Sequence, residues 1–94
     1  MDLLLLKYVK SFSDGRIRIR HPALHRTEVA VLAQEKLHAV NGITKVECNP
    51  ASGSALILYD GKTLSKDRLI AIGKAWAAYL DAVQAGRHAD IPEF

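Results

Sequence analysis

Strict alternation of basic and apolar residues marks one short segment near the start of the chain. Residues 16–20 read Arg-Ile-Arg-Ile-Arg, and His21 and Pro22 follow directly. Successive side chains of a strand point to opposite faces, so the pattern predicts a strand, the arginine strand, that turns Ile17 and Ile19 toward a core. The other face then carries a row of three basic residues, Arg16, Arg18 and Arg20. Pro22 cannot donate to a strand ladder, which predicts that the strand ends near His21.

Residues 3–12 are rich in leucine and aromatic side chains, and Ser13-Asp14-Gly15 separates them from the arginine strand. Glycine at the end of a three-residue loop is typical of a β-hairpin, because it accepts the left-handed conformation that such a loop needs. We therefore predict that this first segment pairs antiparallel with the arginine strand. A short helix over residues 3–10 is the alternative.

Two later segments have apolar residues at the three- and four-residue spacing of amphipathic helices. The first spans residues 27–40, with Thr27 as its predicted N-cap, and residues 41–42, Asn-Gly, supply a C-terminal stop. The second runs from about Lys66 to Gln84, with Ser65 as its predicted N-cap. Trp76 and Tyr79 lie on this second helix and are expected to be core and helix-surface residues rather than a binding cage.

Two strands are predicted between the helices, at Ile43–Asn49 and at residues 55–59, joined by the turn-forming residues Asn-Pro-Ala-Ser-Gly. Alternation divides the first of them into two faces, one with Thr44, Val46 and Cys48 and the other with Ile43, Lys45 and Glu47. The second is apolar on both faces, which favours a central position in a sheet. Cys48 shares a face with Val46, so a buried, inert thiol is expected.

The predicted order of elements is strand, strand, helix, strand, strand, helix. The last five match the βαββα part of a ferredoxin-like unit, whose usual closing strand is missing here. The first strand can take that place beside the arginine strand. We therefore predict an α+β, ferredoxin-like fold of ββαββα order, with a four-stranded antiparallel sheet and two helices on one face. Ninety-four residues suffice for one such domain, residues 1–94, in which 1–14 form the first strand and hairpin turn and 87–94 a flexible polar tail.

Composition narrows the functional classes only a little. Thirteen Lys and Arg against ten Asp and Glu give a net charge of +3, well short of the massed basic residues of typical nucleic-acid-binding domains. Cys48 is the single cysteine, which excludes an intramolecular disulfide and any Cys-x-x-Cys motif. The leucine run at residues 3–6 is too short for a signal sequence or a membrane span, so we expect a cytoplasmic protein without membrane insertion.

Three segments together resemble a known family: residues 15–24, residues 40–46 with Gly-Ile-x-x-Val, and residues 49–60 with Asn-Pro-x-x-Gly and Tyr-Asp. They are similar to the heavy-metal-associated (HMA) domain superfamily, and more narrowly to divergent HMA-like domains that occur alone or ahead of some P-type metal ATPases. The resemblance covers about residues 15–83. It implies a ferredoxin-like fold and a link to metal homeostasis.

One departure from this family decides what the resemblance carries over. Ordinary members bind Cu(I), Zn(II) or similar ions through Cys-x-x-Cys in the loop between the first core strand and the first helix, where two thiolates suit a soft ion. Here that loop, residues 21–25, reads His-Pro-Ala-Leu-His and contains no cysteine. No cysteine ligand therefore transfers to any residue of this chain.

His21 and His25 occupy the place of the missing cysteines. Two imidazoles are candidate ligands for a transition metal such as Zn(II), Ni(II) or Fe(II), or for haem. Two histidines without a third ligand make a weak site. The alternative is that His21 caps or packs beside Pro22.

The arginine row, Arg16, Arg18 and Arg20, is a candidate site for phosphate, an acidic protein surface or nucleic acid. Single-stranded RNA readers of this fold stack bases on aromatic side chains of that face, and the central strands here show no such pair, so nucleic acid is not expected. The alternative is that the row is solvated or pairs with Glu47. Leu56 and Leu58 fall on the same face and predict an interface, with a second copy or with a metal-transport membrane protein.

The chain shows no paired nucleophile and base, no phosphate-binding loop and no carboxylate pair at a useful spacing. We therefore expect a non-enzymatic HMA-like accessory or interaction domain associated with metal homeostasis or with a metal-transporting P-type ATPase. Direct metal or haem binding through His21 and His25 is one alternative. A basic face that binds phosphate or nucleic acid is the other.

Overall fold

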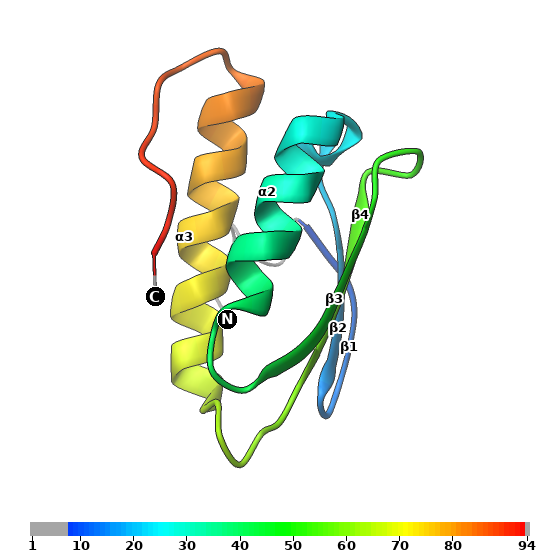
Figure 1. Cartoon of the computed structure of the whole chain (residues 1–94), viewed down its shortest axis with the longest axis vertical. Coiled ribbons are helices and arrows are strands. Elements are labelled where there is room, and N and C mark those ends of the chain that lie inside the picture. Colours follow the sequence, from blue (N-terminus) through cyan, green and yellow to red (C-terminus); the bar gives the residue numbers. More distant parts are fainter. Residues whose placement is uncertain (1–7, 94) are drawn as a thin grey trace.

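The computed structural model describes residues 8–93, in which four antiparallel strands form one sheet and two long helices cover one of its faces (Figure 1). The elements in chain order are β1 (Val9–Ser13), β2 (Arg16–Arg20), the 3₁₀ helix η1 (Pro22–His25), α2 (Thr27–His38), β3 (Ile43–Asn49), β4 (Ser54–Tyr59) and α3 (Lys66–Gln84). This is the predicted α+β, ferredoxin-like arrangement. After α3 the chain returns along the outer side of that helix (Figure 1).

The strand order is β1-β2-β4-β3, so β1 occupies the edge position beside β2. Val9 lies opposite Ile19 and Ser13 opposite Arg16, in an antiparallel pair with a bulge between Val9 and Ser11. The prediction that the first hairpin replaces the closing strand is thus confirmed for Val9–Ser13. The alternative of a helix over residues 3–10 fails for Val9 and Lys10, which belong to β1, whereas Tyr8 just before the strand has helical conformation. The leucine run at 3–6 lies outside the described residues.

The register of the central strands decides which side chains share the face opposite α2 and α3, called the open face below. Arg18 of β2 lies opposite Leu56 of β4, and Leu56 lies opposite Glu47 of β3. The neighbouring row joins Arg16, Leu58 and Lys45 in the same way. Because directly opposed residues point to the same side of a sheet, the arginines and leucines share the open face, as predicted.

The predicted alternation is wrong at the start of β3, because the strand has a bulge between Ile43 and Lys45. An extra residue in one strand reverses the side to which the preceding side chains point. Ile43 is therefore buried together with Val46, instead of sharing a face with Lys45 and Glu47.

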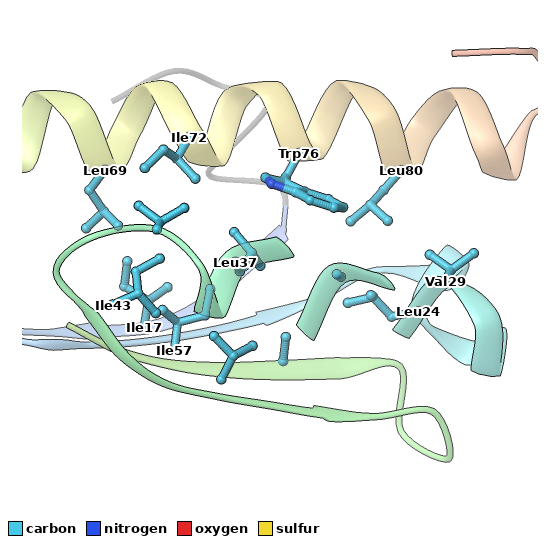
Figure 2. Packing of buried hydrophobic residues seen from close by; sticks show 14 of the residues in the cluster. Ile17, Leu24, Val29, Leu37, Ile43, Ile57, Leu69, Ile72, Trp76 and Leu80 are labelled. Carbon is cyan, nitrogen blue, oxygen red and sulfur yellow. The ribbon is translucent and has the colours of Figure 1, made fainter. Parts of the chain in front are cut away.

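The core lies between the sheet and the two helices. Ile17 and Ile57 rise from the sheet below Leu69 and Ile72 of α3, and Trp76 and Leu80 continue the same layer further along that helix (Figure 2). Trp76 is 4% exposed, and the ring of Tyr79 meets it edge to face at a centroid distance of 5.5 Å. Both residues thus serve packing, as predicted. The largest side chains that are fully buried are those of Leu24, Leu64 and, unusually for a polar residue, His21.

The helix limits agree with the sequence prediction for α3 and differ for α2. Ser65 accepts a hydrogen bond from the N–H of Arg68 at 3.2 Å and caps α3, as predicted. The prediction for Thr27 was wrong, because Thr27 already lies inside α2 and Arg26 is the N-cap, without a side-chain hydrogen bond. The reason is η1, which runs directly into α2: the Arg26 N–H bonds back to the carbonyl of Ala23.

Gly42 is a position where backbone conformation and packing both require glycine. Its φ is +99°, and a Cβ there would lie 2.7 Å from the Cβ of Leu64, which is 1% exposed. Gly86 offers a matched control, since its φ is +75° with no atom within 4 Å of a Cβ.

Gly42→Ala should therefore lower the free energy of unfolding by about 2–4 kcal/mol, from left-handed strain plus overpacking. Gly86→Ala should lower it by only about 1–2 kcal/mol, from strain alone. Urea denaturation of both variants measures the difference. Equal losses would show that the contact with Leu64 carries no cost.

Candidate functional site

The loop between β2 and α2, which holds both candidate histidines, is anchored by His21. The residue is 1% exposed, and its backbone N–H donates to the carbonyl of Gly53 at 2.9 Å. Its ring Nδ1 accepts a hydrogen bond from the N–H of Ala23 at 3.0 Å. His21 is thereby the N-cap of η1, and Pro22 stands at the first helical position, where a missing N–H is harmless.

The other ring nitrogen of His21 faces α3. Nε2 lies 2.8 Å from Oδ1 of Asp81. Because Nδ1 accepts from Ala23, it carries no proton, and the neutral ring must hold its proton on Nε2. Nε2 therefore donates to the Asp81 carboxylate. Both ring nitrogens of His21 are engaged within the protein.

Tyr8 completes this arrangement, called the Tyr8–Asp81–His21 cluster below. Its hydroxyl donates to the same Oδ1 of Asp81, and its ring lies 4.3 Å from that of His21, centroid to centroid, at an interplanar angle of 43°. The hydrogen bond to Asp81, with partial burial and the nearby negative charge, raises the pKa of Tyr8 to about 12. The cluster joins the start of the described chain, the β2–α2 loop and α3.

His25 is exposed and faces a different part of the molecule. Its Nδ1 lies 2.9 Å from the carbonyl oxygen of Pro50, and a carbonyl only accepts, so Nδ1 carries the proton. The ring also lies against Gly53, where a Cβ would come within 2.7 Å of Nε2. The turn at residues 49–53 therefore holds the loop at both ends, through Gly53 to His21 and through Pro50 to His25.

The arginine row lies on the open face, and none of Arg16, Arg18 and Arg20 forms an ion pair among residues 8–93. The alternative of pairing with Glu47 is not found, and the carboxylate of Glu47 contacts Lys45 at 3.5 Å instead. Leu56 and Leu58 are partly exposed beside the row.

Cys48 is half-buried on the core side of β3, less deeply than the prediction of a buried thiol implies. Burial raises the pKa of its thiol to about 11. The side chain is thus a protonated thiol near neutral pH, and a thiolate is the form that binds metal.

A family model described as heavy metal associated domain 2 matches residues 6–84. The chain belongs to this family. Neither a search of curated proteins nor a search of solved structures returns a match. Among the residues that the structure describes, no helix is both long enough and apolar enough to pass through a membrane.

The donors of this HMA domain do not fit a metal ion in the β2–α2 loop. The ring of His21 faces Asp81 and Ala23, whereas that of His25 faces Pro50. Within residues 8–93, no three His, Cys, Asp or Glu side chains gather as a metal site would need. The sequence pattern indicated both histidines but not Asp81 or Tyr8. Asp81 lies 60 positions after His21, and Tyr8 lies 73 positions before Asp81, so neither contact is local in the sequence.

Haem does not fit beside His21 either. The apolar cavity between α3 and the sheet, which His21, Tyr8 and Trp76 help to line, has a volume of about 80 Å³. Pockets for small molecules typically measure about 300–1,000 Å³. A planar macrocycle would have to displace the core side chains of α3.

His21→Ala should lower the free energy of unfolding by about 2–4 kcal/mol, because it removes the cap of η1 and leaves the Asp81 carboxylate and the Ala23 N–H without this partner. His25→Ala, which removes one exposed hydrogen bond, should lower it by less than about 1 kcal/mol. Chemical denaturation compares the two variants. A similar loss in both would contradict the anchoring role of His21.

Asp81→Asn should move the pKa of Tyr8 from about 12 toward its ordinary value of about 10, since the carboxylate is the main cause of the shift. Absorbance titration of the tyrosines measures this, and Tyr8→Phe identifies the transition. Because the folded-state pKa is raised, the stabilisation is complete below about pH 10 and is lost as the pH rises through about 12. If the pKa of Tyr8 were the same in Asp81→Asn as in the wild type, the hydrogen bond from Tyr8 to Asp81 would not be the cause of the shift.

Proposed function

We propose that this HMA domain is a non-enzymatic accessory or interaction domain of metal homeostasis, which works in the cytoplasm beside or ahead of a metal-transporting P-type ATPase. It acts through protein contacts and carries no ion in its β2–α2 loop. The observation that supports this most directly is the engagement of both ring nitrogens of His21, by the Ala23 N–H and by Asp81.

The remaining donors support the same conclusion. Soft ions need thiolates, and the one thiol, Cys48, has a raised pKa and lies on β3 rather than in the loop. Releasing His21 for a metal would break the cap of η1 and the bond to α3 together. Metal binding at this loop would therefore oppose the packing of the fold.

The Tyr8–Asp81–His21 cluster combines groups that serve acid–base catalysis in enzymes, but its position argues against that use. His21 is 1% exposed, and its Nδ1 is occupied by a backbone N–H, so no substrate atom reaches either nitrogen. The cluster ties elements together, which favours a binding domain over an enzyme.

One observation favours the alternative of direct metal binding. When Nδ1 of His25 donates to Pro50, Nε2 holds a lone pair that can coordinate an ion. A single imidazole is one ligand, however, and zinc sites in proteins need at least three. A second protein would have to supply the others.

Titration with Zn(II), Ni(II), Cu(I) and haem tests this part of the proposal. We expect no stoichiometric complex in competition with a chromophoric chelator, and the same result for the double variant His21→Ala and His25→Ala. A one-to-one complex that the double variant loses would establish metal carriage through the loop and contradict the proposal.

Binding to purified cytoplasmic domains of metal-transporting P-type ATPases from the same organism tests the other part. Because the contact is between proteins, we expect the same affinity in the presence of a chelator and in the presence of the transported ion. Interferometry with immobilised HMA domain measures it. Binding that appears only with the metal, or binding to none of these domains, would contradict the proposed role.

A further inference from the structure

The open face carries three cations that the described part of the chain leaves without a counter-charge. Arg16, Arg18 and Arg20 are exposed, they alternate along β2, and no ion pair joins them to residues 8–93. Alternate residues of a strand are roughly 7 Å apart. The guanidinium groups therefore form a line of charge with a regular spacing.

A line of apolar side chains runs parallel to the arginines. Leu56 and Leu58 of β4 lie opposite Arg18 and Arg16 and are partly exposed. Neighbouring strands lie about 4.8 Å apart, so the two lines are about that far from each other. Figure 1 shows that α2 and α3 both lie on the other side of the sheet and leave this face uncovered.

The charges on this face disfavour a second copy of the chain as its occupant. Beyond the leucines, β3 contributes Lys45 and Glu47, and these two already contact each other at 3.5 Å. Face-to-face packing of two copies would bring together two rows of three arginines, and the carboxylate of this face, that of Glu47, already contacts Lys45. Like charges placed opposite each other oppose association.

The side chains between the charges disfavour nucleic acid. Single strands bind to sheets of this kind by stacking bases on aromatic rings, whereas β2 and β4 present arginines and leucines here.

Two parallel lines, one for carboxylates and one for apolar groups, fit a helix better than an extended strand. Successive residues of a strand point to opposite sides, so a strand that faced the arginines with its carboxylates would turn its apolar residues away. On a helix, residues at i, i+4 and i+8 form a line with about 6 Å between them, and residues at i+3 and i+7 form an adjacent line. Both lines then face the sheet at once.

We propose that the open face binds an acidic amphipathic helix of a partner protein, with carboxylates along Arg16, Arg18 and Arg20 and apolar side chains on Leu56 and Leu58. Guanidinium groups bind carboxylates by paired, charge-assisted hydrogen bonds. The inference rests on the proposed function, since it gives the chemistry of the partner that such a domain contacts.

The probe is a synthetic, fluorescein-labelled helical peptide with glutamate at i, i+4 and i+8 and leucine at i+3 and i+7 on an alanine and glutamine background. Fluorescence anisotropy should show binding that weakens between about 0.05 and 0.15 M salt. The triple variant R16Q/R18Q/R20Q should bind at least about tenfold more weakly. The control R26Q/R68Q/R87Q removes three exposed arginines outside the sheet and should stay within about twofold of wild type.

Leu56→Ser with Leu58→Ser should weaken binding at least about fivefold without changing its salt dependence, because only apolar area is lost. Circular dichroism verifies that each variant folds. Equal weakening in the arginine control, or no binding of the peptide, would overturn the inference.

Two further outcomes would assign the face to another occupant. A single-stranded oligonucleotide that binds more tightly than the peptide and is lost in R16Q/R18Q/R20Q would overturn the inference in favour of nucleic acid. Self-association by light scattering that the same variant abolishes would overturn it in favour of a second copy. Each of these failures leaves the metal titration unaffected, so the proposed function is tested separately.

Discussion

The hydrogen bonds of one buried histidine join three parts of this fold. The Nδ1 of His21 fixes the first turn after β2, its Nε2 binds Asp81 near the end of α3, and its backbone N–H binds the β3–β4 turn at Gly53. A buried polar ring is tolerated in a core only when its nitrogens are satisfied, and here both are. The position of the loop therefore depends on this residue.

The same bonds change what the loop can do chemically. In ordinary HMA domains this loop presents two thiolates to a soft ion, whereas here its first residue is turned inward and its last, His25, is held against the β3–β4 turn. A residue that stabilises the fold with both nitrogens has none left for a ligand. We infer that this chain uses the family's scaffold with its metal loop closed.

The sequence predicts most of the fold because its signals are local. Alternation predicts Arg16–Arg20, and helical spacing with Ser65 as a cap predicts Lys66–Gln84, both with the limits that the structure has. The Thr44 bulge and the cap of α2 were missed, because a single extra residue and the turn η1 override the pattern. Neither the bulge in β3 nor the 3₁₀ helix η1 is marked by a residue type that would predict it.

The candidate site was predicted only in part. His21 and the arginines follow from alternation and from the position of Pro22, but the partners of His21 come from distant segments. Asp81 looks like one more polar residue on the exposed side of a helix, and Tyr8 like part of an apolar strand. Only the packing of α3 over the loop brings them together, which no spacing in the sequence reveals.

The tautomer of His21 tests the central claim most directly. Long-range proton–nitrogen correlation spectra of the ¹⁵N-labelled domain distinguish protonated from unprotonated ring nitrogens, and His21→Gln identifies the signal. We expect Nε2 protonated and Nδ1 unprotonated near neutral pH, with no change when Zn(II) is added. A ring that exchanges between tautomers, or whose Nδ1 or Nε2 signal moves with zinc, would contradict the account of a closed metal loop.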